Sequence, residues 1–298
     1  MNSEWDGKSK GSVIGYKLFV FFIKYLGLDF AYFILVFVVL YYLFFSYKTT
    51  KAIYYYFRRR HKYSIIRSIL SIYRNYYLLG QTIIDKIAIS SGLSDNFMYD
   101  FKGEKEMIKE FEKGKGGVFL SSHIGNFGIA HKILKIKNSS LKINIVTLDN
   151  EDIFLKEYLN SIKKTVKINF IKISNDLSHI FKINNALSNN EWICITGDRF
   201  TNQGGFMESK LLDEYAKFPS GIFELASRLK VPVIFVNILK ESRKKYTAYA
   251  KIAKFENRKS KYLLDLYTTN IEFILKKYPL QWFNYFDFWG EINKNEKI

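Results

Sequence analysis

Apolar residues recur along this chain with helical spacing in its first third and in short runs beyond it. In residues 63–90, apolar side chains such as Ile66, Ile69 and Tyr73 fall on one broad face, which predicts a long helix. Beyond residue 90, the short apolar runs are bounded by glycine, proline or polar residues, as strands are. The predicted strands are residues 118–121, 141–148, 166–173, 192–196, 231–237 and 246–253.

Helical periodicity returns between these strands. The predicted helices are residues 104–113, 129–134, 177–188, 218–229 and 263–277, with a loop at residues 202–213. Strands that alternate with helices favour an α/β fold, here a mixed, mainly parallel sheet flanked by helices. We divide the chain into an N-terminal membrane-associating segment, residues 1–62, and an α/β domain, residues 63–298.

The N-terminal segment combines an amphipathic helix with a stretch that has no charge. Residues 13–28 carry apolar side chains at helical spacing, and residues 30–47 contain no charged side chain. The second stretch is close to the minimum of about 17 residues for crossing a bilayer, and tyrosines lie at both of its ends. We therefore predict an apolar helix that associates with a membrane, and whether it spans the bilayer or lies in it stays open.

A basic region follows the apolar stretch directly. Lysines and arginines occur from Lys48 to Arg74, and no acidic residue follows them before Asp85. A basic cluster beside an apolar stretch predicts a cytoplasmic flank on an anionic membrane surface. The alternative is a buried core helix followed by a solvated basic helix.

Composition narrows the classes of partner. The 298 residues contain 46 Lys and Arg against 28 Asp and Glu, a formal net charge of +18. Such an excess suits nucleic acid, acidic lipid and an acidic carrier protein equally well. Because much of the charge adjoins a stretch too hydrophobic for a soluble RNA-binding protein, we expect no nucleic-acid partner. The single Cys194 excludes internal disulfides and any zinc site with several cysteines.

The candidate chemistry centres on residues 114–130, where glycines open a predicted strand and a turn follows it. His123 falls just past the carboxyl end of that strand, at the rim where α/β sheets bind their ligands. A lone histidine is more often structural, but the neighbouring glycines let backbone and substrate approach this one closely. A histidine near neutral pKa can take a proton from a hydroxyl that attacks a thioester. His123 is therefore the candidate catalytic base.

Four short motifs, in order, resemble those of the lipid A late acyltransferases of the lysophospholipid acyltransferase-like superfamily. They are His-Ile-Gly-Asn-Phe from residue 123, Gly-Asp-Arg-Phe from residue 197, Phe-Pro-Ser-Gly with a later Val-Pro-Val from residues 218 and 231, and a closing Trp-Phe at residue 282. The resemblance implies acyl transfer from an acyl carrier protein or coenzyme A thioester to a hydroxyl of a lipid or glycolipid, without a bound cofactor. It also implies attachment to the cytoplasmic face of the inner membrane through the N-terminal helix.

The chain departs from this family at one motif position. The family motif is a His, four residues, and then Asp or Glu, and Gly128 stands at that last position. We expect Asp149 or Asp198 to take over the acid's role, because both follow apolar strands whose carboxyl ends should share a rim with His123. The alternative is a catalytically silent relative that still binds lipid.

Three further residues are candidates for contacts with the substrate near His123. Backbone amides around Gly125 and Asn126, at a helix N-terminus, are expected to donate to the oxyanion of the reaction. Arg199 offers a guanidinium fork to a phosphate of the donor or the acceptor. Its alternative role is a salt bridge with Asp198 or Asp213.

Ser220 is a candidate substrate-binding residue, because the wider superfamily often has Glu before the glycine of this Pro-x-Gly block. Other chemistry finds little support in the sequence. It contains no Gly-x-Ser-x-Gly elbow and no phosphate-cradling Gly-Lys-Ser or Gly-Lys-Thr loop. No histidine has the partners of a metal site. Ser121 and Ser122 are expected to end a strand, and Cys194 to be a buried apolar residue.

Overall fold

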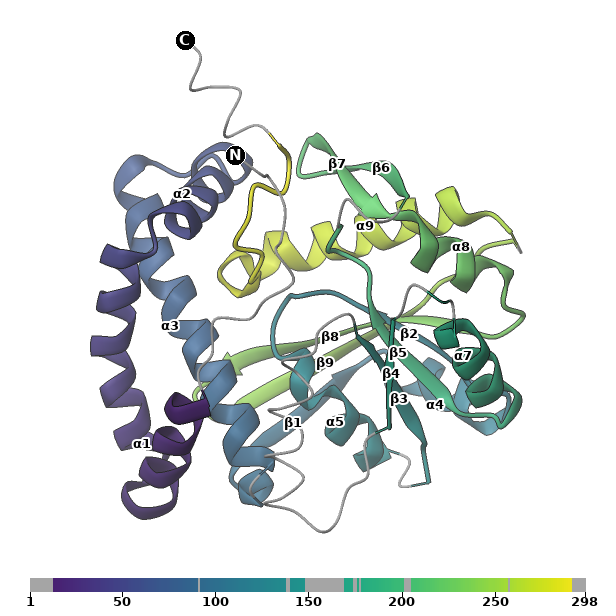
Figure 1. The fold of residues 1–298 in the computed structure, drawn as a ribbon, viewed down its shortest axis with the longest axis horizontal. Coiled ribbons are helices and arrows are strands. Elements are labelled where there is room, and N and C mark those ends of the chain that lie inside the picture. The colour runs from purple at the N-terminus through teal and green to yellow at the C-terminus, as the bar shows by residue number, and fades with distance from the viewer. Residues whose placement is uncertain are drawn as a thin grey trace.

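The computed structural model describes residues 13–90, 92–137, 140–147, 169–173, 176, 178–200, 205–256 and 258–290. Within these residues, seven strands form one sheet in the order β1-β9-β8-β2-β5-β3-β4 (Figure 1). Neighbouring strands run parallel except β8 and β9, which are antiparallel. The strands are β1 (Met98–Lys102), β2 (Gly117–Ser121), β3 (Ile143–Thr147), β4 (Asn169–Lys172), β5 (Trp192–Thr196), β8 (Val233–Ser242) and β9 (Lys245–Ile252).

Helices flank this sheet, which confirms the predicted mixed, mainly parallel α/β fold. Each predicted strand and helix of the α/β region has a counterpart, with ends that differ by a few residues. The sequence does not predict β1 or the helix α2. The helical elements are α1 (Val13–Phe45), α2 (Tyr47–Tyr55), η1 (Tyr56–Arg60), α3 (Ile65–Ser90), η2 (Leu93–Asn96), α4 (Glu104–Glu112), η3 (Phe127–Ile129), α5 (Ala130–Lys137), α7 (Ser178–Ser188), α8 (Ser220–Arg228), α9 (Ser260–Lys277) and η4 (Pro279–Gln281).

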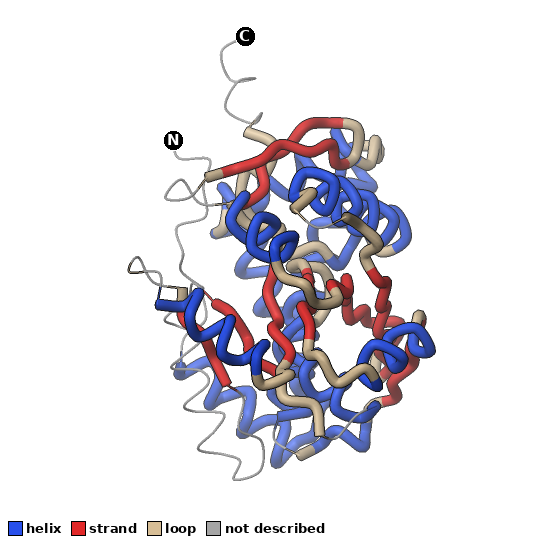
Figure 2. Tube along the Cα trace, turned by 90° about the vertical axis from the view of Figure 1, so that its right-hand side faces the viewer, coloured by secondary structure: helices blue, strands red, loops and turns tan. Residues whose placement is uncertain are grey.

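The predicted loop at residues 202–213 is wrong in its second part. There β6 (Phe206–Leu211) and β7 (Glu214–Pro219) form an antiparallel hairpin, which Figures 1 and 2 show apart from the large sheet. Leu212 and Asp213 make its two-residue turn with φ of 51° and 69°. Such turns usually carry Asn or Gly, so a leucine at this place gave no turn signal.

Different helices cover the two faces of the sheet. Phe119 of β2 stacks on Trp192 of β5 with 4.4 Å between ring centroids, and Phe111 of α4 contacts both rings. On the other face, Tyr267 of α9 contacts Phe235 of β8. Successive side chains of a strand point to opposite faces. The sheet is therefore buried on both faces, and its carboxyl-end rim is left for the site.

The apolar helix α1 lies along α3 on one flank of the molecule (Figure 1). Gly27, with φ of 83° and ψ of 169°, kinks α1 near the end of the first predicted stretch, residues 13–28. From Tyr25 to Phe45 the helix is long and apolar enough to cross a membrane, and 22% of its most apolar window is buried. Its inner side packs on the protein, whereas Phe33, Phe37 and Phe44 are exposed.

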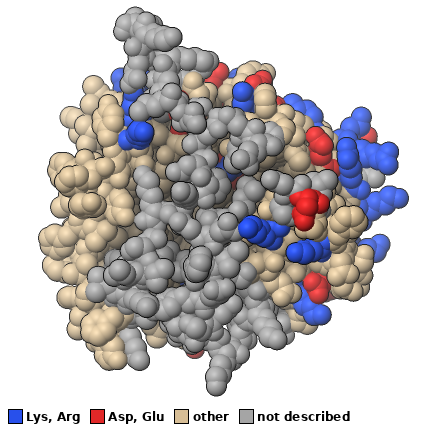
Figure 3. All heavy atoms as spheres, in the orientation of Figure 1, with Lys and Arg blue, Asp and Glu red and all other residues tan. Residues whose placement is uncertain are grey.

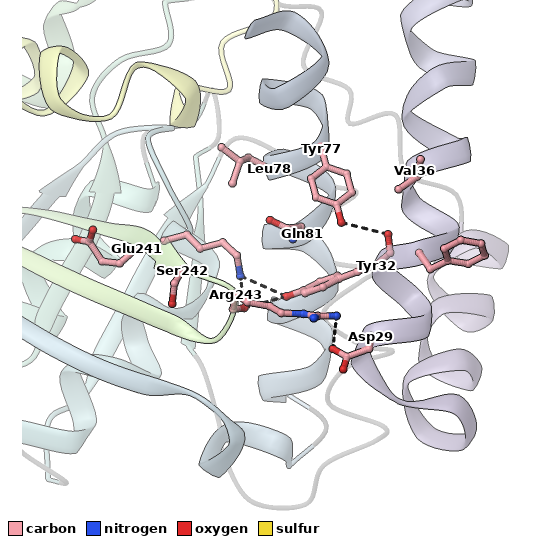
Figure 4. Close-up of a pocket in the computed structure, with 11 residues that line it drawn as sticks. Asp29, Tyr32, Val36, Tyr77, Leu78, Gln81, Glu241, Ser242 and Arg243 are labelled. Atoms are coloured by element: carbon pink, nitrogen blue, oxygen red, sulfur yellow. Dashed lines mark hydrogen bonds and ion pairs between the residues drawn. The ribbon is translucent and has the colours of Figure 1, made fainter. Parts of the chain in front are cut away.

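A buried polar cluster joins α1 to α3 and to the sheet. Asp85 of α3 accepts hydrogen bonds from Tyr32 of α1, from Tyr246 of β9 and from Lys240 of β8, the last at 2.5 Å. Figure 4 shows Tyr32 extending from α1 towards the β8–β9 turn. Burial raises the pKa of Asp85 and lowers that of Lys240, and their mutual attraction offsets part of both shifts. These contacts cross the predicted boundary at residue 62, which stays a prediction.

We expect Asp85→Ala to lower the free energy of unfolding by about 3–5 kcal/mol, because it leaves the Lys240 ammonium buried without its partner. The matched control is Asp29→Ala, which breaks the exposed ion pair with Arg243 and should cost less than about 1 kcal/mol. Denaturant unfolding of the protein in a neutral detergent measures both. Equal losses in the two variants would contradict the prediction.

Candidate active site

The candidate site lies at the carboxyl-end rim of β2 and β5. Both β2 and β3 pair in parallel with β5, so the predicted sharing of one rim is confirmed. His123 follows β2 by two residues, and Asp198 follows β5 by two residues. Asp149, the other candidate for the missing acid, lies outside the described residues. Of the two aspartates, the structure describes only Asp198, and that residue contacts His123.

The Asp198 carboxylate is surrounded by four N–H groups. Its Oδ1 lies 2.7 Å from Nδ1 of His123, and its Oδ2 accepts a hydrogen bond from the His123 backbone amide at 2.9 Å. The Trp282 indole and the Asn284 side-chain amide donate to the same Oδ2, each at 3.2 Å. Because Asp198 is fully buried, these donors replace the water that its charge loses.

This surrounding favours an ionised Asp198 and fixes the tautomer of a neutral His123 ring. Burial raises the pKa of Asp198, but the charge and hydrogen bonds of His123, with the charge of Arg199, outweigh burial and lower the pKa below 3.8. An ionised carboxylate only accepts hydrogen bonds, so Nδ1 carries the proton of a neutral His123 ring. Nε2 then carries the lone pair, on a side chain that is 27% exposed. The arrangement suits a base that is oriented by an acid.

The turn after His123 requires glycine at position 125. Gly125 has φ of +72°, and a Cβ there would lie 2.0 Å from the carbonyl oxygen of Ile238 in β8. The Gly125 amide donates to the Gln281 carbonyl at 2.8 Å, and the Asn126 amide donates to the Ile238 carbonyl at 2.7 Å. Both amides are thus engaged within the protein. The oxyanion role of Gly125 and Asn126 stays a prediction, and this geometry gives it no support.

The Asn126 side chain also points into the protein. Its Nδ2 donates to the Thr82 carbonyl of α3 at 2.9 Å and lies 3.3 Å from the Tyr246 hydroxyl. Tyr246 in turn donates to Asp85. Asn126 therefore anchors the turn after His123 to the buried cluster that holds α1.

Arg199 holds the segment that carries Asn284. Its Nε donates to Asn284 Oδ1 at 3.2 Å, and one terminal nitrogen donates to the Phe283 carbonyl at 3.2 Å. Because Asn284 itself donates to Asp198, Arg199 supports the carboxylate indirectly as well as through its charge. Its contact with a substrate phosphate stays a prediction.

The structure also shows the positions of the other residues named in the sequence. Ser121 and Ser122 both hydrogen-bond to β8, as expected for strand-end residues. Cys194 is buried, and burial raises the pKa of its thiol to about 12. Ser220 begins α8 directly after the hairpin, and its part in substrate binding stays a prediction. Within the described residues, no three His, Cys, Asp or Glu side chains group as metal ligands would.

Gly128 faces a lysine of α3. A Cβ at this position would lie 2.6 Å from Cδ and 3.2 Å from Nζ of Lys86. An acidic side chain here would therefore meet the Lys86 ammonium directly. The sequence gives no sign of this neighbour, because Lys86 is 42 residues away along the chain.

Residues 281–284 complete the site, a role that the sequence does not predict. The Phe283 amide donates to the His123 carbonyl at 2.9 Å, while Trp282 and Asn284 donate to Asp198. Nothing in the local pattern shows that the chain returns to His123 after its last long helix. The family resemblance marked the Trp-Phe pair, but gave it no role.

Residues 61–284 match the family described as bacterial lipid A biosynthesis acyltransferase. The match covers more than half of the chain, and it includes His123, Asp198 and the segment that ends at Asn284. A search of curated proteins gave no match.

The lowered pKa of Asp198 predicts a pH-dependent contribution to stability. The ionised Asp198 carboxylate stabilises the folded protein fully above the ordinary carboxyl pKa of 3.8, and this stabilisation is lost as the pH falls through the lower folded value. The difference in free energy of unfolding between the natural protein and Asp198→Asn should shrink as the pH falls below 3.8. Urea titrations at stepped pH measure it, and a difference that does not shrink below 3.8 would refute the ionised state.

Proposed function

Because the chain belongs to the bacterial lipid A biosynthesis acyltransferase family, we propose that it moves a fatty acyl group from an acyl carrier protein or coenzyme A thioester to a hydroxyl of a lipid or glycolipid. The observation that carries this proposal is the 2.7 Å contact between His123 Nδ1 and the buried Asp198 carboxylate. Through this contact the motif histidine, His123, has an acidic partner, although Gly128 stands where the family motif has its acid.

In the proposed reaction, Nε2 of His123 takes the proton of the acceptor hydroxyl as the oxygen attacks the thioester carbonyl. Asp198 keeps the Nδ1 proton in place and stabilises the imidazolium that forms. The tetrahedral intermediate collapses with cleavage of the C–S bond, and the imidazolium returns its proton to the leaving thiolate. The products are an ester and a free thiol, so no bound cofactor is consumed.

We place this activity at the cytoplasmic face of the inner membrane. Members of the family are typically membrane-associated, and α1 supplies an apolar helix near the N-terminus. The flank on which α1 lies carries almost no charged side chains (Figure 3). The basic region from Lys48 to Arg74 follows α1 directly, and such regions stay on the cytoplasmic side.

The proposal is tested by lipid mass spectrometry of cells that lack the gene and then express each variant. An acylated lipid should disappear without the gene and return with the natural protein. His123→Ala should lower its formation by about 10²–10⁴, as expected for a general base. Asp198→Asn should lower it by up to about 10⁴, because the amide no longer holds the reactive tautomer.

Thermal unfolding of each purified variant separates lost activity from lost folding. Activity of His123→Ala within a few-fold of the natural protein would mean that another residue is the base. A lipid profile that does not change when the gene is removed would instead favour a silent lipid-binding relative.

Restoring the family's acid should not help this protein. We expect Gly128→Glu to leave acyl transfer no higher than in the natural protein, because the new carboxylate meets Lys86 and Asp198 already binds Nδ1 of His123. Gly128→Ala is the matched control, since it displaces Lys86 without adding charge. A large gain from Gly128→Glu in the same lipid assay, with Asp198 dispensable, would overturn the assignment of Asp198.

A further inference from the structure

A groove of about 590 Å³ lies between the exposed side of α3 and residues 277–281. Arg67 and Arg74, which lie seven residues apart and so on the same face of α3, line one wall, and Lys277 lines the other. The Arg67 guanidinium lies 3.7 Å from the centre of the Tyr63 ring, which holds it in place. The residues that line this groove include three cationic side chains and no acidic one.

The charges of this groove differ from those of the pocket between α1 and α3 shown in Figure 4. That pocket has a similar volume, about 570 Å³, but Asp29 and Glu241 line it, and Asp29 pairs with Arg243. The groove is positive by contrast. Nearby, the pKa of His61 is lowered to about 4, first by burial and then by the charges of Arg67 and Lys276. An anion is therefore favoured in the groove.

The groove also has apolar walls. Ile66 and Leu70 of α3 line it together with Leu280, and these α3 side chains are 74% and 55% exposed. Exposed apolar side chains gathered at a cavity indicate a binding surface. A purely ionic ligand, or an acidic carrier protein that binds through surface charges alone, would leave these side chains in water. An acyl chain would cover them.

The groove wall continues into the segment that completes the active site. Asn75 of α3 donates to the carbonyls of Leu280 and Trp282, each at 3.0 Å, and so fixes this wall to the helix. The next residue, Phe283, donates to the His123 carbonyl. A molecule held in the groove therefore contacts the chain within a few residues of the segment that binds His123.

We propose that this groove binds a membrane lipid that bears a phosphate, with the phosphate at Arg67, Arg74 and Lys277 and the start of an acyl chain on Ile66, Leu70 and Leu280. The proposal rests on the proposed function only in that the protein acts at a membrane, and the binding itself does not need catalysis.

The test uses phosphatidic acid with a photoreactive group near the head of its acyl chain, added to the full chain in vesicles of phosphatidylcholine. Mass spectrometry of the labelled peptides should place labels in residues 63–78 and 278–283. Arg67→Gln with Arg74→Gln should reduce this labelling about 30-fold, from the loss of two cations beside an anionic lipid. Lys230→Gln with Arg258→Gln is the matched control, since it removes the same charge at the far pocket by α8 and should leave the labelling unchanged.

Three further arms can overturn the proposal. Equal labelling by a phosphatidylcholine of the same design would show that the phosphate is not recognised. If inorganic phosphate blocks the labelling as well as a short-chain phosphatidic acid does, the groove is only an anion site. If acyl carrier protein blocks the labelling selectively, the groove binds that partner instead. His123→Ala should keep full labelling, so loss of acyl transfer and loss of lipid binding are measured apart. All variants are compared at matched thermal stability.

Discussion

The Asp198 carboxylate is the interaction on which the geometry of the site depends. It is fully buried, and its charge is stabilised because donors from two segments converge on it: the turn after β2, and residues 282–284 with the Trp282 indole and the Asn284 amide. A buried charge that loses such donors is costly, so residues 282–284 stabilise the same carboxylate that orients His123.

A second buried carboxylate, Asp85, connects that site to the apolar helix. Tyr246 donates to Asp85 and contacts Asn126 in the turn after His123, while Tyr32 donates to Asp85 from α1. The hydrogen bonds form a continuous chain from the apolar helix to the turn after His123. Loss of α1 would remove Tyr32 from a cluster that also contains the buried Lys240 charge. The apolar helix is thus part of the packing of the domain.

The sequence predicts those parts of the molecule that local pattern determines. The run before His123 shows a buried strand, and the alternation of runs gives the order of strands and helices. It also brings His123 and Asp198 to one rim, because both follow apolar strands. It does not show the partners of the amides of Gly125 and Asn126, which are Gln281 and Ile238, more than 100 residues away. The β6–β7 hairpin is a local feature, but the sequence does not predict it, because Leu212 occupies a turn position where Asn or Gly is usual.

These contacts bear on the absence of the motif acid at position 128. Nδ1 of a histidine donates one hydrogen bond, and Asp198 already accepts it at 2.7 Å. An acid at position 128 would add a second negative charge beside this turn, and its nearest opposite charge would be Lys86. Such an acid would form an ion pair with α3 and would leave the histidine unchanged. With Gly128, the protein lacks only a carboxylate that would not contact His123 in this arrangement. The departure from the family motif is therefore compatible with His123 as the proposed base.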